Sequence, residues 1–355
     1  MEREATHIES FGRFLSDQPQ SERPFLLLDP GGDHRYLFKQ SRGALRQVAS
    51  LVGGEGLQRS LGSYTLRGCS YLPSVARLVP LVSQTTVRLP EDYDFDVGIV
   101  SNRTRLIQLD ERTVYTLPTD DEEGIVKEAT VRQRLPDGIN TPEFYERDLE
   151  YPYFAEAFIS GRRPKSPDDD WPVIESALLQ LEALYRQREA RIETASLVSE
   201  IERELESRAL LDASPFRAAL SMLDTLALPE YVYESPVHGD LHARNVLESD
   251  GEVYILDWEN YGRGRVFEDF FKPFAVSHYD TRDPTLFGEF VDGDGRGGAM
   301  FDSYMERLGE YVCSDPRPYA GLPVLYLLAD LASEERRGLW ESYRELLASL
   351  VSARS

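Results

Sequence analysis

One stretch in the second half of the chain brings acidic and amide side chains together in a fixed order. Residues 237–259 read V-H-G-D-L-H-A-R-N-V-L-E-S-D-G-E-V-Y-I-L-D-W-E. Asp240 and Asn245 lie five residues apart on a short polar segment. A turn rich in Ser, Asp and Gly follows, and then an apolar strand, Val253–Leu256, which ends at Asp257. The pattern predicts a hairpin that presents two carboxylates and one amide at the same end.

This set of side chains is the one that phosphoryl transfer requires. A carboxylate orients the attacking hydroxyl group and accepts its proton, and hard cations such as Mg²⁺ prefer the oxygen ligands that Asn and Asp provide. The spacing from Asp240 to Asn245 matches the catalytic loop of protein kinases, and Asp257 follows where those enzymes carry a metal-binding Asp. The stretch therefore indicates transfer of a phosphate group.

The order H-G-D-x-H-x-x-N-V-L, followed by a strand and D-W-E, resembles the aminoglycoside phosphotransferase / choline kinase-like family. The resemblance implies that Asp240 is the catalytic base, with Asn245 in the same catalytic loop. It implies that Asn245 and Asp257 are magnesium ligands. It also implies structural support of the site by His238, which would brace the loop, and by Asp269, in an element similar to the family's G-x-x-x-x-D-L.

An ordinary hairpin with a solvated acidic tip is the alternative interpretation. The H-G-D triplet, the Asn, the Asp after the strand and the later Asp all occur in register, and four such features rarely coincide by chance. We therefore favour the kinase-like interpretation. His242, inside the same stretch, is interpreted as a packing or hydrogen-bonding residue, because buried His side chains are commonly just satisfied by their neighbours.

The segment 94–160 predicts a small antiparallel sheet and one helix, in the order of the family's N-terminal lobe. Runs rich in β-formers alternate with turn residues, and a cluster of acids begins the helix. The expected strands are 97–101, 105–109, 113–117, 144–148 and 153–158, and the expected helix is 119–135. The ending E-x-F-I-x-G, with Glu156 and Phe158, resembles the family's hinge, where the adenine binds.

The third strand departs from the family pattern. A kinase-like strand carries a Lys there, which pairs with a helix Glu and with the phosphates of the nucleotide. In this chain the strand reads T-V-Y-T-L-P, with Thr116 near the expected place. Glu128 is the candidate helix Glu, and Lys127 lies beside it. The resemblance thus assigns nucleotide binding to Glu128, Lys127, Glu156 and Phe158.

Two alternatives address the displaced lysine. In the first, residues 125–131 form the third strand and Lys127 binds the phosphates, but this register leaves no room for the helix before Pro142. In the second, Lys127 lies on the helix. An arginine, Arg103 or Arg105, then substitutes for the strand lysine, or the protein binds the phosphates only weakly.

The sequence patterns outside residues 94–160 predict a helical lobe after this segment and an N-terminal extension before it. Residues 161–355 predict a mainly helical lobe that carries the catalytic loop, with late helices at 298–313, 321–333 and 335–352, and with 277–297 as a loop over the site. Residues 1–93 have no counterpart in the family and form an appended module or an elaborated N-terminal lobe. The predicted fold is α+β and bilobal, with a protein-kinase-like arrangement: a small antiparallel-sheet N-lobe at 94–160, a mainly helical C-lobe and an N-terminal extension.

Composition bounds the environment and the partners. The net charge is −23, and only four of the 39 basic residues are Lys, which leaves 39 − 4 = 35 Arg. A surplus of acid with little Lys resembles proteins of salt-loving archaea, and the charge argues against a nucleic-acid partner. Two distant Cys residues exclude a disulfide framework. We find no signal peptide and no apolar run long enough for a membrane span, and we expect a cytoplasmic protein.

These patterns predict a phosphotransferase that moves the terminal phosphate of ATP (or GTP) to a hydroxyl group of a small molecule, with Mg²⁺ as cofactor. The alternative is a catalytically weak or inactive kinase-like binding or regulatory protein, which the missing strand lysine favours and the complete Asp240, Asn245 and Asp257 set opposes. The acceptor and the oligomeric state are left open.

Overall fold

A computed structural model resolves the chain into two compact units, each described here by itself. The sheet unit comprises residues 1–134 and 142–160, and the helical unit comprises residues 135–141 and 161–355. The structure describes residues 8–12, 14, 16, 18–29, 34–52, 66, 69–71, 73, 76, 82–101, 103–119, 122–148, 150–211, 215–333 and 337–354. The glycine-rich run at 53–56 has neither G-x-G-x-x-G nor Walker spacing, so its sequence predicts a plain loop, and it lies outside these residues.

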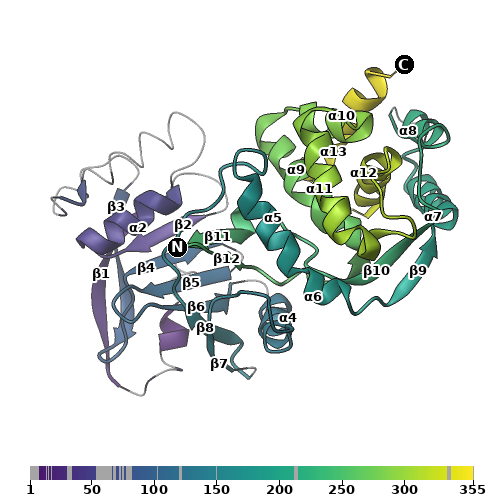
Figure 1. Ribbon diagram of the computed structural model, residues 1–355. Coiled ribbons are helices and arrows are strands. Elements are labelled where there is room, and N and C mark those ends of the chain that lie inside the picture. Colours follow the sequence, from purple (N-terminus) through teal and green to yellow (C-terminus); the bar gives the residue numbers. More distant parts are fainter. Residues whose placement is uncertain are drawn as a thin grey trace. The chain divides into compact units, whose positions relative to one another are not determined.

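The sheet unit is built on eight strands that are all paired antiparallel, in the order β3-β1-β2-β4-β5-β6-β8-β7 (Figure 1). Their bounds are β1 (Gln20–Leu28), β2 (Arg35–Phe38), β3 (Val82–Pro90), β4 (Val97–Val100), β5 (Arg103–Gln108), β6 (Thr113–Pro118), β7 (Phe144–Asp148) and β8 (Tyr153–Ala157). The five strands predicted between residues 94 and 160 are therefore confirmed, with small shifts at their ends.

Two helices cover parts of this sheet. Because side chains of a strand alternate between its faces, each face contributes its own core. The helix α2 (Arg42–Val52) packs Leu45 and its apolar neighbours against one face. The helix α4 (Glu122–Arg132) packs Ile125 against Phe154 of β8. An aromatic cluster that includes Phe11, Tyr93 and Tyr153 fills the opposite face.

The register that made residues 125–131 a strand is wrong, because these residues lie within α4. Glu122 and Glu123 stand in the first turn, where acids stabilise the helix dipole. Ile125 and Ala129, four residues apart, are both buried, as one face of a helix requires. Local charge and helical spacing therefore outweigh the strand-like composition of this run.

The extension joins the same sheet. Strands β1, β2 and β3 supply three of its eight strands, so the hydrogen-bonded ladder continues across the predicted boundary at residue 93. Basic side chains of the extension pair with acids of the same unit: Lys39 Nζ lies 2.7 Å from Asp94 and 3.4 Å from Asp96. Residues 31–90 hold eight Lys or Arg residues against two acids, a net charge of 8 − 2 = +6, and among the described residues part of this charge is neutralised by acids of the sheet unit itself.

The helical unit consists mainly of helices (Figure 1). Its buried core is rich in aromatic residues. Its helices are α5 (Trp171–Gln180), α6 (Glu182–Tyr185), α7 (Thr194–Ser207), α8 (Phe216–Leu223), α9 (Val266–Thr281), α10 (Thr285–Asp292), α11 (Gly295–Val312), α12 (Gly321–Ser333) and α13 (Arg337–Ser352), with the short 3-10 helix η2 (Ala243–Asn245). The three predicted late helices are confirmed. None of the described helices is long and apolar enough to cross a membrane.

The loop predicted at 277–297 is wrong, because this segment is mostly helical. The helix α9 runs on to Thr281, and α10 follows from Thr285. Phe287, Phe290 and Val291 lie at helical spacing and are buried. The ring of Phe287 packs on Phe271 of α9, and the ring of Phe290 packs on Phe274. The Asp and Gly residues that suggested a loop instead mark the helix ends, where Gly293 adopts a left-handed conformation.

Two small sheets complete the helical unit. The first has the order β13-β10-β9, and the second is the hairpin β11-β12. Their bounds are β9 (Ala190–Glu193), β10 (Tyr231–Val237), β11 (Val246–Ser249), β12 (Glu252–Ile255) and β13 (Gly262–Arg265). The strand β10 leads directly into residues 238–245, so these sheets deliver both ends of the predicted catalytic loop.

Candidate functional site

The hairpin β11-β12 has the geometry that its sequence predicts. Asp250 and Gly251 have φ angles of 52° and 84°, as a tight two-residue hairpin turn requires. At the open end, the backbone N–H of Leu256 donates to the carbonyl oxygen of Asn245 at 2.9 Å. Asn245 and Asp257 therefore leave the two strands next to each other.

A fully buried carboxylate fixes the start of the loop. Asp269, near the beginning of α9, accepts hydrogen bonds from the backbone N–H groups of His238 and Gly239, both at 3.0 Å. The hydroxyl of Tyr185 donates to the same carboxylate at 3.0 Å. Burial raises the pKa of Asp269 above its ordinary value, and the donors oppose that effect. The prediction that Asp269 supports the loop is consistent with these contacts.

His238 links the loop to the end of the hairpin. Its Nδ1 accepts from the backbone N–H of Asp240 at 3.2 Å, so its Nε2 carries the proton and donates to the carbonyl oxygen of Leu256 at 3.0 Å. The ring is fully buried and lies 4.6 Å, centroid to centroid, from Trp258. One imidazole thereby ties residue 240 to the strand end that carries Asp257.

The Asp240 carboxylate faces a second imidazole. The Nδ1 of His242 accepts from the backbone N–H of Arg244 at 3.2 Å, so its Nε2 carries the proton, and it lies 3.5 Å from Oδ2 of Asp240. Burial raises the pKa of Asp240, but the hydrogen bond from His242 and the charge of Lys272 act in the opposite direction and outweigh burial. The pKa of Asp240 is therefore held below its ordinary value, so the side chain is ionised at neutral pH.

The donor set at the hairpin end suits a hard cation. The Asn245 amide nitrogen donates to the carbonyl oxygen of Asp240 at 3.0 Å, so the amide oxygen points the other way. Asp257 has a φ of 62°, a left-handed conformation that is uncommon outside glycine and recurs at functional sites. Among the described residues, no group of three His, Cys, Asp or Glu side chains is placed to hold a metal. A Mg²⁺ ion here would draw its remaining ligands from phosphate oxygens and water.

The loop is also held at its far end. Nη2 of Arg244 lies 2.7 Å from both carboxylate oxygens of Asp280, in the last turn of α9. Asp269, three turns earlier on the same helix, holds the loop's beginning. Lys272, one turn after Asp269, is 7% exposed, and its Nζ lies 3.6 Å from Asp330 of α12. The predicted catalytic loop thus lies along α9 between two attachments.

In the sheet unit, Glu128 is buried and paired with an arginine. Its Oε2 lies 2.6 Å from Nη1 of Arg103, and the side chains are 4% and 2% exposed. Lys127, the neighbouring residue of α4, is exposed. The cation that meets the helix Glu is therefore Arg103, one of the two arginines that the sequence left open, and Lys127 lies on the outer face of the helix.

The other two predicted nucleotide-binding residues are held by protein contacts. Glu156 forms an ion pair with Arg132, whose guanidinium also donates to the carbonyl oxygen of Pro142 at 2.6 Å. Phe158 packs against the core cluster of α2, and its backbone N–H donates to the carbonyl oxygen of Arg112 at 2.6 Å. The Glu156 carboxylate therefore has a structural partner inside the sheet unit.

The sequence did not predict how two residues near Asp240, His242 and Lys272, interact with their neighbours. His242 is hydrogen-bonded, as interpreted, but its partner is the candidate base itself. Lys272 was not singled out, although it is one of only four lysines in the chain. Its scarcity was the available signal, whereas its burial depends on α12 and α13, which no local pattern places beside it.

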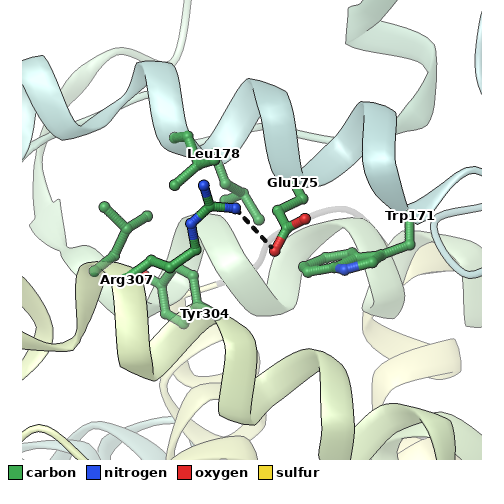
Figure 2. Close-up of a pocket in the computed structure, with 7 residues that line it drawn as sticks. Trp171, Glu175, Leu178, Tyr304 and Arg307 are labelled. Carbon is green, nitrogen blue, oxygen red and sulfur yellow. Dashed lines mark ion pairs between the residues drawn. The ribbon is translucent and has the colours of Figure 1, made fainter.

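A shallow hollow in the helical unit lies away from this motif in sequence. Figure 2 shows Glu175 of α5 and Arg307 of α11 facing each other across it, 3.6 Å apart. Its empty volume is about 170 Å³, open space included, and Ser303 donates to Glu175 at 2.7 Å. These contacts join two helices, and no residue of the catalytic loop lines the hollow.

Comparison with known proteins gives one family and several distant structures. Residues 98–311, more than half of the chain, match the family described as "Phosphotransferase enzyme family". No curated protein sequence matches significantly.

Three of the similar solved structures are two forms of one aminoglycoside phosphotransferase and a choline kinase. Aminoglycoside phosphotransferase APH(4)-Ia is 13% identical over 99% of both chains, with a TM-score of 0.47. A thermostable mutant of that protein, in a ternary complex with ADP and hygromycin B, is 12% identical over 72% of this chain and 89% of that one, with a TM-score of 0.43. Choline kinase LicA from Streptococcus pneumoniae is 15% identical over 72% of this chain and 88% of its own, with a TM-score of 0.40.

Proposed function

Because the chain belongs to the phosphotransferase enzyme family, we propose that it moves the terminal phosphate of ATP or GTP to a hydroxyl group of a small molecule. Membership gives the enzyme class, a kinase, and the α+β, protein-kinase-like fold that the sequence predicts. The nucleotide, the acceptor class and the residue roles below are our proposal.

The observation that carries the proposal is the Asp240 carboxylate on a rigidly held loop. Asp269 and His238 fix the backbone that leads into it, through the N–H groups of residues 238 to 240, and His242 lies 3.5 Å from its carboxylate. Asp240 would orient the acceptor hydroxyl and take its proton as the oxygen attacks phosphorus. Because such transfers ask for little covalent chemistry, positioning and charge stabilisation supply most of the rate enhancement.

The amide oxygen of Asn245 and the carboxylate of Asp257 would hold Mg²⁺. The ion would neutralise the charge of the nucleotide's phosphates. Asn245 and Asp257 are attached to one hairpin whose open end is closed by a backbone hydrogen bond, so their spacing is fixed before any ligand arrives.

A kinase-like binding protein without turnover is the second candidate function. Its support is Thr116, which stands on β6 where a phosphate-binding Lys is expected and is 1% exposed. The complete Asp240, Asn245 and Asp257 set argues for the enzyme.

The first test measures magnesium-dependent thermal stabilisation by ATP and by GTP in molar KCl. We expect a shift in the wild type that is lost in Asp257→Asn, because the amide removes the charge while tolerating the left-handed backbone. Absence of any shift in the wild type would favour the binding-protein candidate with a different ligand.

The second test uses an acceptor found by screening hydroxylated small molecules. Asp240→Asn should reduce turnover at least about 10²-fold, the lower range for loss of a general base, while leaving nucleotide binding intact. Asp250→Asn, at the exposed far tip of the same hairpin, is the matched control and should turn over normally. Normal turnover in Asp240→Asn would refute the mechanism.

A further inference from the structure

The eight-stranded sheet ends in two edge strands, β7 and β3, and β7 is protected from pairing with another chain. It has five residues, its register shifts between Phe144 and Glu146, and its last three residues, Glu146-Arg147-Asp148, are all charged. A short strand, a bulge and charged side chains each discourage a further strand from pairing.

The strand β3 has none of these features over its first half. It has nine residues and pairs with β1 along its whole length without a shift in register. Residues 82–86 read V-S-Q-T-T, without charge or proline, and Ser83, Gln84 and Thr86 are exposed. Among the described residues, no strand pairs with the side of β3 that faces away from β1. We call this side, along residues 82–86, the open edge.

The hydrogen bonds around β3 show which of its backbone groups point away from β1. The backbone N–H of Arg88 donates to the carboxylate of Glu9 at 3.1 Å, so Arg88 faces outward. Because the bonding direction alternates along an antiparallel strand, the N–H and C=O groups of Gln84 and Thr86 face outward as well. Pro24 of β1, which has no N–H, lies opposite Thr86 and agrees with this direction. Glu9 therefore closes the outward side at Arg88, and the open edge ends before it.

The open edge is complementary to a second copy of itself. A two-fold axis at Thr85 places Gln84 of one copy opposite Thr86 of the other, and each such pair can exchange both backbone hydrogen bonds. Thr85 then lies opposite Thr85 of the second copy, and cross-strand pairs of threonine are favourable. An interface with two-fold symmetry uses the same patch on both chains, as this one does.

Charge also favours this place for contact between copies. The net charge of −23 makes two copies repel each other, so a contact that brings acids together is costly. Residues 82–86 have no charge, and the nearest charged residue of β3, Arg88, lies 3.4 Å from Glu22 of β1. The hydroxyl and amide side chains of the open edge offer no charge by which a foreign strand could be selected.

We propose that two copies of this chain associate through the open edge, with β3 antiparallel to β3 of the second copy, so that the two sheets join into one. The inference concerns the sheet unit and does not depend on the proposed phosphotransferase function. Because the paired stretch is short, the dimer is weak, with a dissociation constant in the micromolar range. The extension then both covers β4 and supplies the contact between copies.

The first test measures amide hydrogen exchange by NMR at increasing protein concentration. The N–H groups of Gln84 and Thr86 should exchange more slowly as the dimer forms. Those of Ser83 and Thr85 already face β1, so their exchange should change little with concentration. This alternation distinguishes strand pairing from other contacts, which would protect neighbouring residues alike.

The second test measures the dissociation constant by analytical ultracentrifugation in molar KCl. Thr86→Pro removes the outward N–H and no bond to β1, and proline is accepted on edge strands. Each chain loses one hydrogen bond to the other, so the dissociation constant should rise about ten- to a hundredfold. Thr86→Val keeps the N–H and is the matched control, which should associate like the wild type.

A pair of double variants keeps the test decisive if Thr86→Pro unfolds. Gln84→Lys with Thr86→Lys places lysines opposite each other across the axis, and like charges in that position oppose pairing. Gln84→Glu with Thr86→Glu does the same with acids. Each should be monomeric alone, whereas their mixture should associate, measured in the lowest salt that keeps both folded because salt screens these charges. Circular dichroism confirms that each variant is folded.

Three outcomes would overturn the inference. The first is a wild type that stays monomeric up to about 0.1 mM, well above a micromolar dissociation constant. The second is a dimer that persists unchanged in Thr86→Pro and in both double variants, which would place the interface elsewhere. The third is an equal loss of association in Thr86→Val and Thr86→Pro, which would assign the contact to the hydroxyl group instead of the backbone.

Discussion

Burial shifts the pKa values of two side chains on α9 in opposite directions, because it disfavours the charged form of each. Asp269 is fully buried and accepts three hydrogen bonds that favour its charged form. His278, 4% exposed, has its pKa lowered by burial and further by the charge of Arg282, while Asp283 and Glu345 oppose the shift. His278 is therefore kept neutral at neutral pH.

The burial of His278 predicts a loss of stability in weak acid. A lowered folded-state pKa means that the unfolded chain binds the proton first, so the stability is complete above about pH 6.5 and falls as pH drops towards the folded pKa. We expect the midpoint of thermal unfolding to decrease more between pH 7.5 and pH 5 in the wild type than in His278→Gln. Each unit of pKa difference corresponds to about 1.4 kcal/mol.

Parallel pH curves for the two proteins would show that folding does not lower the pKa of His278. Because every other titrating group is shared, the difference between the curves isolates this one side chain. Asp280→Asn, on the exposed side of the same helix, serves as the control and should leave the slope close to that of the wild type.

At the residue scale, the positions of side chains could be predicted from the sequence where a local motif determines them. The loop geometry around Asp240, Asn245 and Asp257 depends on one short hairpin, and it could be predicted. The partner of Glu128 could be narrowed only to Arg103 or Arg105, because both project from one face of one strand. The burial of Lys272 could not be predicted, since it arises from helices more than fifty residues further along the chain.

At the element scale, α9 acts as the support on which the loop is laid. Its first turn holds the loop through Asp269 with no exposure to water, whereas its last turn holds it through the Arg244–Asp280 pair, whose side chains are 61% and 38% exposed. Exposed ion pairs contribute little to stability, and a buried acceptor with three donors contributes much more.

We therefore predict unequal effects of cutting the two attachments. Asp269→Asn should destabilise the protein by about 1–3 kcal/mol or more, because an amide N–H₂ would meet buried N–H groups that need an acceptor. Arg244→Met should cost about 0–1 kcal/mol. Urea unfolding at constant salt measures both, and equal losses would show that the loop depends on its far end as much as on its buried one.

Helices and strands were predictable where the apolar period was uninterrupted, as in α11, α12 and the strands β4 to β8. The segment 277–297 misled because Asp and Gly are frequent in both loops and helix caps. Phe287, Phe290 and Val291 carried the helical period there, and they became decisive only once α9 provided a surface to cover.

At the scale of the whole molecule, the negative charge is the dominant feature. The chain has 62 acidic and 39 basic residues, and its net charge of −23 makes it repel itself. Salt shortens the range of that repulsion from about 10 Å at 0.1 M to about 3 Å at 1 M. We predict that the unfolding midpoint rises with KCl between 0.1 and 2 M.

Sucrose at matched osmolality separates screening from solute exclusion, because it stabilises compact states without screening charge. A midpoint that does not depend on KCl, or one that sucrose raises equally, would contradict the prediction of a salt-requiring protein.

The kinase-like fold could be predicted at this scale from one motif, whereas the continuation of the sheet into residues 20–90 could not, because no family pattern covers them.

The position of β4 inside the sheet affects how the chain can be made. Residues 98–311 match the family, and β4, at the start of this range, pairs with β2 of the extension. Without the extension, the N–H and C=O groups along that edge of β4 would be unpaired and could form hydrogen bonds with a strand of another chain. A ribosome releases β1, β2 and β3 before β4, so the strands that cover the edge are ready when it emerges. The order of synthesis thus protects the nascent family domain from self-association, and moving the extension to the C-terminus would remove that protection.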